Sequence, residues 1–238
     1  MKIINKYMAA NRVLILGESG MGKSTSMRTL DPKETFIINV LGKPLPFKGW
    51  RAKYTAWTRE NPMGNLYTSS KASEILACMD YINSKRPEIK NIVIEDLIYI
   101  MSLELFDRAK ETGYAKFTDA AVNIKNVAER PKNYREDLIL FYITHPDTTT
   151  DIEGNKVIKS KMGGRMIESQ LNFEGLFDKV LYCRPRKTKD KGLEFGFETK
   201  TDGITPTKTP MEMFEDSFIP NDLQLVRDAI LEYEGATV

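Results

Sequence analysis

The stretch RVLILGESGMGKSTSMRTL, residues 12–30, restricts the fold of this chain more than any other. An apolar run leads into a glycine-rich loop, and a segment of helical character follows. Residues 17–24 fit the pattern G-x-x-x-x-G-K-[ST], which needs a strand before it and a helix after it. Glycines in such a loop let backbone N–H groups face phosphates, and the helix start adds partial positive charge. The sequence therefore predicts a loop that binds the phosphate chain of a nucleotide.

The residues of this loop have different expected roles. We expect Lys23 to reach the β- and γ-phosphates and the Ser24 hydroxyl to join the coordination shell of Mg²⁺. Thr25 is a less specific neighbour. The residues expected to contact the nucleotide are Gly17, Glu18, Ser19, Gly20, Met21, Gly22, Lys23, Ser24 and Thr25.

A second motif, NIVIEDLIYI at residues 91–100, supplies acidic residues. A P-loop needs a carboxylate near the metal, usually at the end of a neighbouring apolar strand. Glu95 takes that position, where aspartate is the common occupant, so Asp96 shares the metal role or positions the attacking water. One of the two could instead cap a helix that starts at residue 97.

Polar residues also end two other apolar runs. His145, the only histidine, and Thr144 close the run LILFYIT, and Asn39 closes TFIIN. Since the carboxyl ends of strands are where an α/β sheet binds its ligand, these residues are candidate γ-phosphate sensors. The alternative for His145 is a position in a surface loop.

The charge of the chain is unevenly distributed. The formal net charge is +2, from 35 Lys and Arg against 33 Asp and Glu, which requires neither a nucleic-acid nor a membrane partner. Residues 156–191, however, hold 10 basic and 4 acidic residues. They form a solvated face, a contact to a nucleic-acid backbone, or a finger that reaches the nucleotide of an adjacent subunit. The candidate contact residues are Lys156, Lys159, Lys161 and Arg165.

Short apolar runs alternate with longer segments of helical spacing. The runs are typical of strands buried on both faces of a parallel sheet. We expect strands at residues 13–16, 35–40, 91–94, 138–144 and 179–182, and helices at 23–30, 71–85, 97–111 and 118–130. Residues 42–64, rich in Pro and Gly, are expected to be irregular. The alternation predicts an α/β fold with a mostly parallel, doubly wound sheet.

The pattern changes after residue 144. A Gly-Asn turn within residues 148–161 predicts a hairpin, and residues 192–203 alternate like a strand. We expect a small antiparallel C-terminal edge and a last helix at 221–233, capped by Asn221 or Asp222. Length and composition fit one domain, residues 1–238, with its core at about 11–184 and the addition at about 185–238.

Other features exclude some classes of protein. Cys78 and Cys183 lack the spacing of a disulfide framework or a zinc site, and we see neither a signal peptide nor a membrane span. A soluble cytoplasmic protein is expected. Residues 199–202 (TKTD) and 151–154 (DIEG) match guanine-nucleotide patterns, but Asp151 lies in the expected hairpin rather than at a core strand, so adenine is preferred.

Taken together, these residues resemble a known family. The chain is similar to phage-encoded AAA/RecA-like ATP-binding proteins, which are related to the phage single-strand annealing and recombination ATPases built on one RecA core. The resemblance covers most of the chain and includes ETFIINVLGKPLPFKG, IVIEDLIYIMSLELFDRAKETGYAKFT, REDLILFYITHPD, KMGGRMIESQLNFEGLFDKVLYC and TKTPMEMFE.

The resemblance implies a RecA-like P-loop core in which residues 17–24 bind ATP and Mg²⁺. Glu95-Asp96 stand where the family commonly has two aspartates, a difference that concerns the rate of hydrolysis more than binding. Thr144 and His145 match the polar pair after the family's fourth strand. The segment after His145 takes the place of a DNA-facing loop, although its sequence does not transfer contacts residue by residue.

Three functional hypotheses follow. The first is a Mg²⁺-dependent ATPase of phage DNA metabolism, in the host cytoplasm, that assembles on single-stranded DNA as a filament or ring for recombination or annealing. Other phage replication or recombination proteins are its expected partners. The second is a nucleoside or nucleotide kinase whose lid is residues 156–165. The third is a loader protein switched by ATP binding, with negligible hydrolysis.

Overall fold

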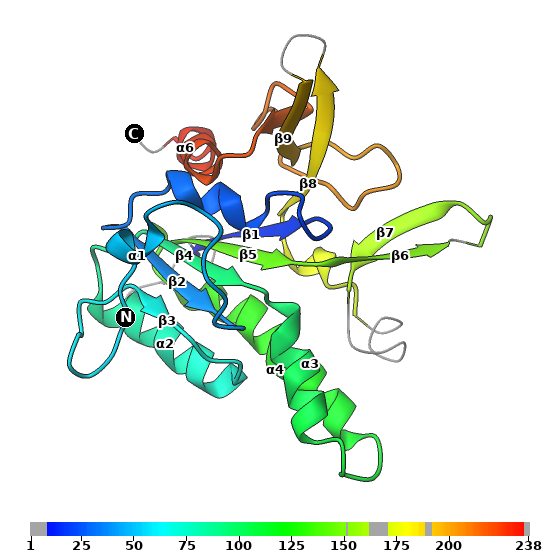
Figure 1. Cartoon of the computed structure of the whole chain (residues 1–238). Coiled ribbons are helices and arrows are strands. Elements are labelled where there is room, and N and C mark those ends of the chain that lie inside the picture. The colour runs from blue at the N-terminus through cyan, green and yellow to red at the C-terminus, as the bar shows by residue number, and fades with distance from the viewer. Residues whose placement is uncertain (1–8, 151, 162–170, 189–191, 236–238) are drawn as a thin grey trace, which may run out of the picture.

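A computed structural model describes residues 9–150, 152–161, 171–188 and 192–235 of the 238-residue chain. It is a mixed α/β structure with an eight-stranded, mostly parallel sheet and a separate two-stranded antiparallel sheet (Figure 1). The predicted α/β class is confirmed.

The large sheet has the order β10-β9-β8-β1-β5-β4-β2-β3. All neighbours from β8 to β3 pair in parallel, whereas β9 and β10 add in antiparallel fashion at one edge. The strands are β1 (Asn11–Leu16), β2 (Thr35–Asn39), β3 (Leu66–Tyr67), β4 (Asn91–Glu95), β5 (Ile139–Thr144), β8 (Lys179–Thr188), β9 (Gly192–Glu198) and β10 (Phe218–Pro220). The small sheet pairs β6 (Pro146–Thr150) with β7 (Lys156–Ser160).

The central strands β1, β2, β4 and β5 are buried on both faces, and neighbouring apolar residues of each strand point to opposite sides. On one face Leu14 and Tyr142 pack with α2 (Ala72–Lys85), α3 (Ile98–Asp107) and α4 (Ala115–Glu129). On the other face, Ile15 and Phe141 pack with residues of η1 (Ser24–Thr29) and α6 (Leu223–Tyr233). Helices thus cover both faces, as predicted for a doubly wound sheet.

Several elements differ from their predicted form. The segment after the glycine-rich loop is a six-residue 3₁₀ helix, η1, rather than the expected α-helix at residues 23–30. Its hydroxyl side chains hydrogen-bond to nearby carbonyls, with Ser26 on Lys23 and Thr29 on Ser26, which competes with regular helix formation. Strands β3 and β10 were not predicted, because each has only two or three residues.

Outside the sheet, the remaining predictions hold with shifted ends. Residues 42–64 are irregular apart from the short helix α1 (Trp50–Lys53). The predicted hairpin forms as β6–β7, and the last helix is capped by Asp222, whose side chain accepts from the Leu225 N–H. Short 3₁₀ turns occur at η2 (Arg130–Asn133) and η3 (Glu174–Leu176).

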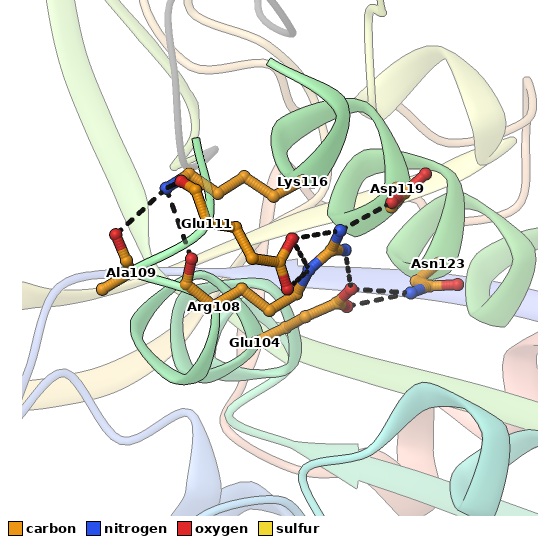
Figure 2. A network of polar contacts seen from close by, with 7 residues as sticks. All are labelled: Glu104, Arg108, Ala109, Glu111, Lys116, Asp119 and Asn123. Carbon is orange, nitrogen blue, oxygen red and sulfur yellow. Dashed lines mark hydrogen bonds and ion pairs between the residues drawn. The ribbon is translucent and has the colours of Figure 1, made fainter. Parts of the chain in front are cut away.

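The hairpins α3–α4 and β6–β7 extend away from the large sheet, and the β8–β9 hairpin, which belongs to the sheet, projects beyond its neighbour β1 (Figure 1). The tip of α3–α4 is tied by a polar network in which the Arg108 guanidinium contacts Glu104, Glu111 and Asp119 (Figure 2). Lys116 donates from its Nζ to the Glu111 carbonyl at 2.7 Å. These contacts hold the two helices together where apolar packing runs out.

Two further features bear on the predicted class of protein. Among the residues described, no helix has the length and apolar character needed to cross a bilayer. Cys78 and Cys183 are buried free thiols, and burial raises the pKa of both to about 12. Neither thiol is therefore ionised at neutral pH.

Candidate nucleotide-binding site

The glycine-rich loop leaves the carboxyl end of β1 in a conformation that glycine makes possible. Gly20 and Gly22 have φ values of 79° and 91°, in the left-handed region that side chains rarely adopt. Gly17 is required for a different reason, since a Cβ there would lie 2.7 Å from the Cys183 carbonyl oxygen on β8. The loop is thus packed against the neighbouring strand at its start and tightly turned at its end.

Lys23 closes this loop. Its Nζ donates to the Glu18 carbonyl oxygen at 2.9 Å, so the side chain folds back over the loop. Burial lowers the pKa of the Lys23 ammonium, and the nearby charge of Glu95 opposes this effect. The cation is therefore held where the loop encloses a space for phosphate.

Glu95 is brought to the loop by the sheet. It ends β4, and the Ser24 hydroxyl donates to its Oε1, which joins residues from the two motifs found in the sequence. Its other oxygen, Oε2, is buried and has no hydrogen-bond partner among the described residues. Burial raises the pKa of the Glu95 carboxyl to about 7. A cation at Oε2 would satisfy this oxygen and favour the ionised form.

Asp96 belongs to a different cluster. Its φ of 63° is left-handed, and its carboxylate meets Lys43 Nζ at 2.9 Å and His145 Nε2 at 3.4 Å. Tyr99 completes the group, with its ring edge-on to His145 and 5.4 Å from Lys43 Nζ. Burial alone would raise the pKa of Asp96, but the contacts to His145 and Lys43 lower it. Asp96 therefore stays ionised, and the two predicted acids have distinct surroundings.

These groups face one pocket of about 260 Å³. Three of the predicted nucleotide contacts, Gly17, Glu18 and Met21, do not line this pocket. Among the candidate sensors, His145 and Asn39 line the pocket, whereas Thr144 is buried in the sheet. The lining residues are Ser19, Gly20, Gly22, Lys23, Ser24, Thr25, Asn39, Lys43, Pro44, Leu45, Pro46, Glu95, Asp96 and His145.

The oxygen atoms in this pocket suit Mg²⁺. The Ser24 hydroxyl, Glu95 Oε2 and Asn39 Oδ1 are hard oxygen ligands, and the last two are buried without partners among the described residues. No three His, Cys, Asp or Glu side chains of the described chain gather into a metal cage. Mg²⁺ does not need one, because it is usually held by one or two carboxylates together with substrate phosphates.

Three of the basic residues predicted to contact DNA or a neighbouring subunit lie on or next to the β6–β7 hairpin, Lys161 at its base and Lys156 at its far end. Lys156 and Lys159 are exposed on β7, and the backbone N–H of Lys161 donates to the His145 carbonyl at 2.9 Å. Arg165 lies outside the described residues. Since β6 begins directly after His145, the hairpin is a continuation of the strand that ends at the pocket.

The guanine-type motif at residues 199–202 does not line this pocket. Asp202 instead accepts from the backbone N–H groups of Ile204 and Thr205, both at 2.9 Å, and shapes a turn. Asp151, the first residue of the other guanine-type pattern, lies outside the described residues. The arrangement gives no support to guanine recognition by residues 199–202.

Two residues of the site were not predicted. Lys43 comes from the irregular segment after β2, where Asn39 Nδ2 holds its carbonyl at 2.6 Å. Asn221, considered only as a helix cap, donates from Nδ2 to the Gly22 carbonyl at 3.1 Å and accepts from Arg28. The signal for Lys43 in the sequence was weak and consisted of the tripeptide GKP at residues 42–44. No local pattern identifies Asn221, because its partners are almost 200 residues away.

Comparison with known proteins adds no identification. No protein-family model matches the chain, and no curated protein sequence matches it. The resemblance to phage ATP-binding proteins therefore stays a prediction from the sequence, and function has to be inferred from the geometry of the site.

Proposed function

We propose that the chain is a Mg²⁺-dependent P-loop ATPase. The observation that carries this proposal is the contact between Ser24 and Glu95, which joins the hydroxyl of the glycine-rich loop to a strand-end carboxylate whose second oxygen is unpaired. That is the pairing a nucleotide-bound Mg²⁺ requires. Lys23, buried in the same pocket, supplies the cation for the phosphates.

The strand order supports a RecA-like core within this class. β5 lies between the loop strand β1 and the acid strand β4, and β8 flanks β1 on its other side. We take this separation of the loop strand from the acid strand as support for an ATPase over the kinase alternative. The antiparallel strands β9 and β10 would then be an addition to that core.

The residues have separate roles in the proposed hydrolysis. Lys23 binds the β- and γ-phosphates, while Ser24 and Glu95 are the residues that hold Mg²⁺. When bound, Mg²⁺ would neutralise negative charge on the phosphates. Asp96, kept ionised by Lys43 and His145, accepts a hydrogen bond from the attacking water. Although glutamate, Glu95, stands at the strand end where aspartate is common, the neighbouring Asp96 is an ionised carboxylate that positions the water.

The biological role we propose is assembly on single-stranded DNA as a filament or ring, in phage recombination or annealing within the host cytoplasm. The β6–β7 hairpin supports this role, because it carries Lys156 and Lys159 and is joined through Lys161 to His145. Both lysines are exposed, and their positive charges would attract the phosphate backbone. Other phage replication or recombination proteins remain the expected partners.

ATP turnover measured with and without single-stranded DNA tests this function. We expect Mg²⁺-dependent release of ADP and phosphate that DNA stimulates and that Lys23→Ala abolishes. Lys159→Ala combined with Lys161→Ala should remove the stimulation and leave basal turnover intact, whereas Lys85→Ala on α2 should change neither. Transfer of phosphate to a nucleoside would support the kinase instead. Assembly with ATP but without turnover would support the switched loader.

A further inference from the structure

A second cavity, of about 720 Å³, adjoins the phosphate pocket. The two share Gly20, Gly22 and Thr25, so the glycine-rich loop forms the wall between them. The rest of the lining comes from η1 and from the C-terminal strands, and comprises Arg28, Arg186, Glu194, Phe195, Phe218, Pro220 and Asn221. The two pockets therefore adjoin at the glycine-rich loop, on either side of Gly20, Gly22 and Thr25.

Arg186 stacks over the ring of Phe218 in the cavity, and this pair is called the Arg186–Phe218 platform. The Arg186 guanidinium carbon lies 4.6 Å from the centroid of the Phe218 ring. The ring itself is fixed by Gly196 on β9, where a Cβ would come within 2.5 Å of it. An arginine plane and a phenylalanine ring are the two kinds of surface on which nucleobases stack.

The opposite wall is held by hydrogen bonds. Arg28 Nη1 donates to the Asn221 carbonyl at 2.9 Å and to its Oδ1 at 3.0 Å, and Asn221 Nδ2 donates to Gly22. These contacts fix the C-terminal segment against the loop, so the cavity keeps its shape next to the phosphate site. Arg28 and Asn221 are thus engaged with each other through Nη1 of Arg28.

We propose that this cavity binds the base and ribose of the nucleotide, with the base stacked on the Arg186–Phe218 platform. The inference rests on the proposed function, since it needs the phosphates in the neighbouring pocket. Because stacking grows with the area of the aromatic face, the ligand class is purine nucleotides in preference to pyrimidine nucleotides. The C-terminal strands thus contribute the base subsite and the core contributes the phosphate subsite.

Comparison of Mg²⁺–ATP with Mg²⁺–tripolyphosphate, which has no base, tests the proposal. Calorimetric affinities would be measured for the wild type, Arg186→Ala, Phe218→Leu and the control Lys187→Ala, which removes an exposed positive charge from the adjacent residue of β8. We expect each platform variant to bind ATP about tenfold more weakly. Tripolyphosphate affinity should stay unchanged, which also shows that the variant is folded.

The outcomes separate the two proposals. ATP affinity within about twofold of wild type in both platform variants, or equal weakening of both ligands, would overturn the base subsite while leaving the P-loop function standing. Wild-type protein that binds neither ATP nor tripolyphosphate would overturn both. CTP should bind the wild type more weakly than ATP, and equal affinity for the two would contradict the stacking argument.

Discussion

Replacement of Asn221 by alanine is the sharpest test of how the C-terminal segment supports the nucleotide site. Asn221 is 6 % exposed, and its side chain connects Gly22 in the loop to Arg28 on η1. Asn221→Ala removes the neutral hydrogen bond to Gly22, a weak one to Cys183 Sγ at 3.4 Å and one with a charged donor. The Gly22 carbonyl keeps the Ser26 N–H at 3.1 Å, so it is not left without a partner.

The magnitude follows from these contacts. The neutral bond is worth about 1 kcal/mol. The bond from Arg28 is worth less than the usual range of about 1.5–3 kcal/mol for a charged donor, also about 1 kcal/mol, because Arg28 is exposed to solvent screening. We therefore expect the free energy of unfolding to fall by about 2 kcal/mol, measured by urea denaturation with an unchanged m-value. Mg²⁺–ATP affinity should fall severalfold, because ATP binding must then order the loop.

A matched variant separates the two contacts. Asn221→Asp keeps an acceptor for Arg28 but lacks the N–H that reaches Gly22, so it should weaken ATP binding although the contact to Arg28 is retained. A loss of stability below about 0.5 kcal/mol in Asn221→Ala, within the range of ordinary surface substitutions, together with wild-type ATP affinity, would refute the reasoning.

Two further predictions concern stability. Gly17→Ala should lower the free energy of unfolding by about 1–3 kcal/mol in urea denaturation, because its Cβ would lie 2.7 Å from the Cys183 carbonyl oxygen; an unchanged value would contradict the close packing of β1 and β8. Asp80→Asn should destabilise the protein at pH 7, because Arg130 and then Tyr134 lower the pKa of Asp80 in the folded state. A lowered folded-state pKa stabilises above the ordinary carboxyl pKa and is lost as the pH falls through the lowered value. The deficit should therefore shrink toward acid in unfolding curves recorded across pH, and a pH-independent deficit would argue against the ion pair.

The parts of the fold that could be predicted are those encoded locally. The apolar runs around Val13, Val93 and Phe141 identify strands because successive residues are apolar. Successive side chains point to opposite faces, so both faces of each strand are buried. Glu95 follows its apolar run directly, so its place at the carboxyl end of the strand was predictable. Its contact with Ser24 follows once β4 lies near β1.

What could not be predicted depends on contacts between distant segments. The three-residue strand β10 exists because it pairs with β9, and its Phe218 meets Arg186 only after that pairing. Lys43 gains its partner Asp96 through an irregular loop that has no periodic pattern. The segment after Lys23 had helical character, yet local hydroxyl contacts made it a 3₁₀ helix. For β10 and Lys43, the partner residues lie too far away in the sequence to be seen in a local pattern. For η1, the hydrogen bonds of the hydroxyl side chains decide the helix type, and the spacing of apolar residues does not reveal them.

The position of His145 gives the proposed DNA-stimulated turnover a physical basis. Its ring faces Asp96 in the nucleotide pocket, while its carbonyl accepts from Lys161 at the base of the β6–β7 hairpin. Because no loop separates β5 from β6, a DNA strand that shifts the hairpin must also shift the backbone of His145. A movement of that backbone would change the contact between His145 and Asp96, so in the proposed function DNA binding and water positioning would both act through His145.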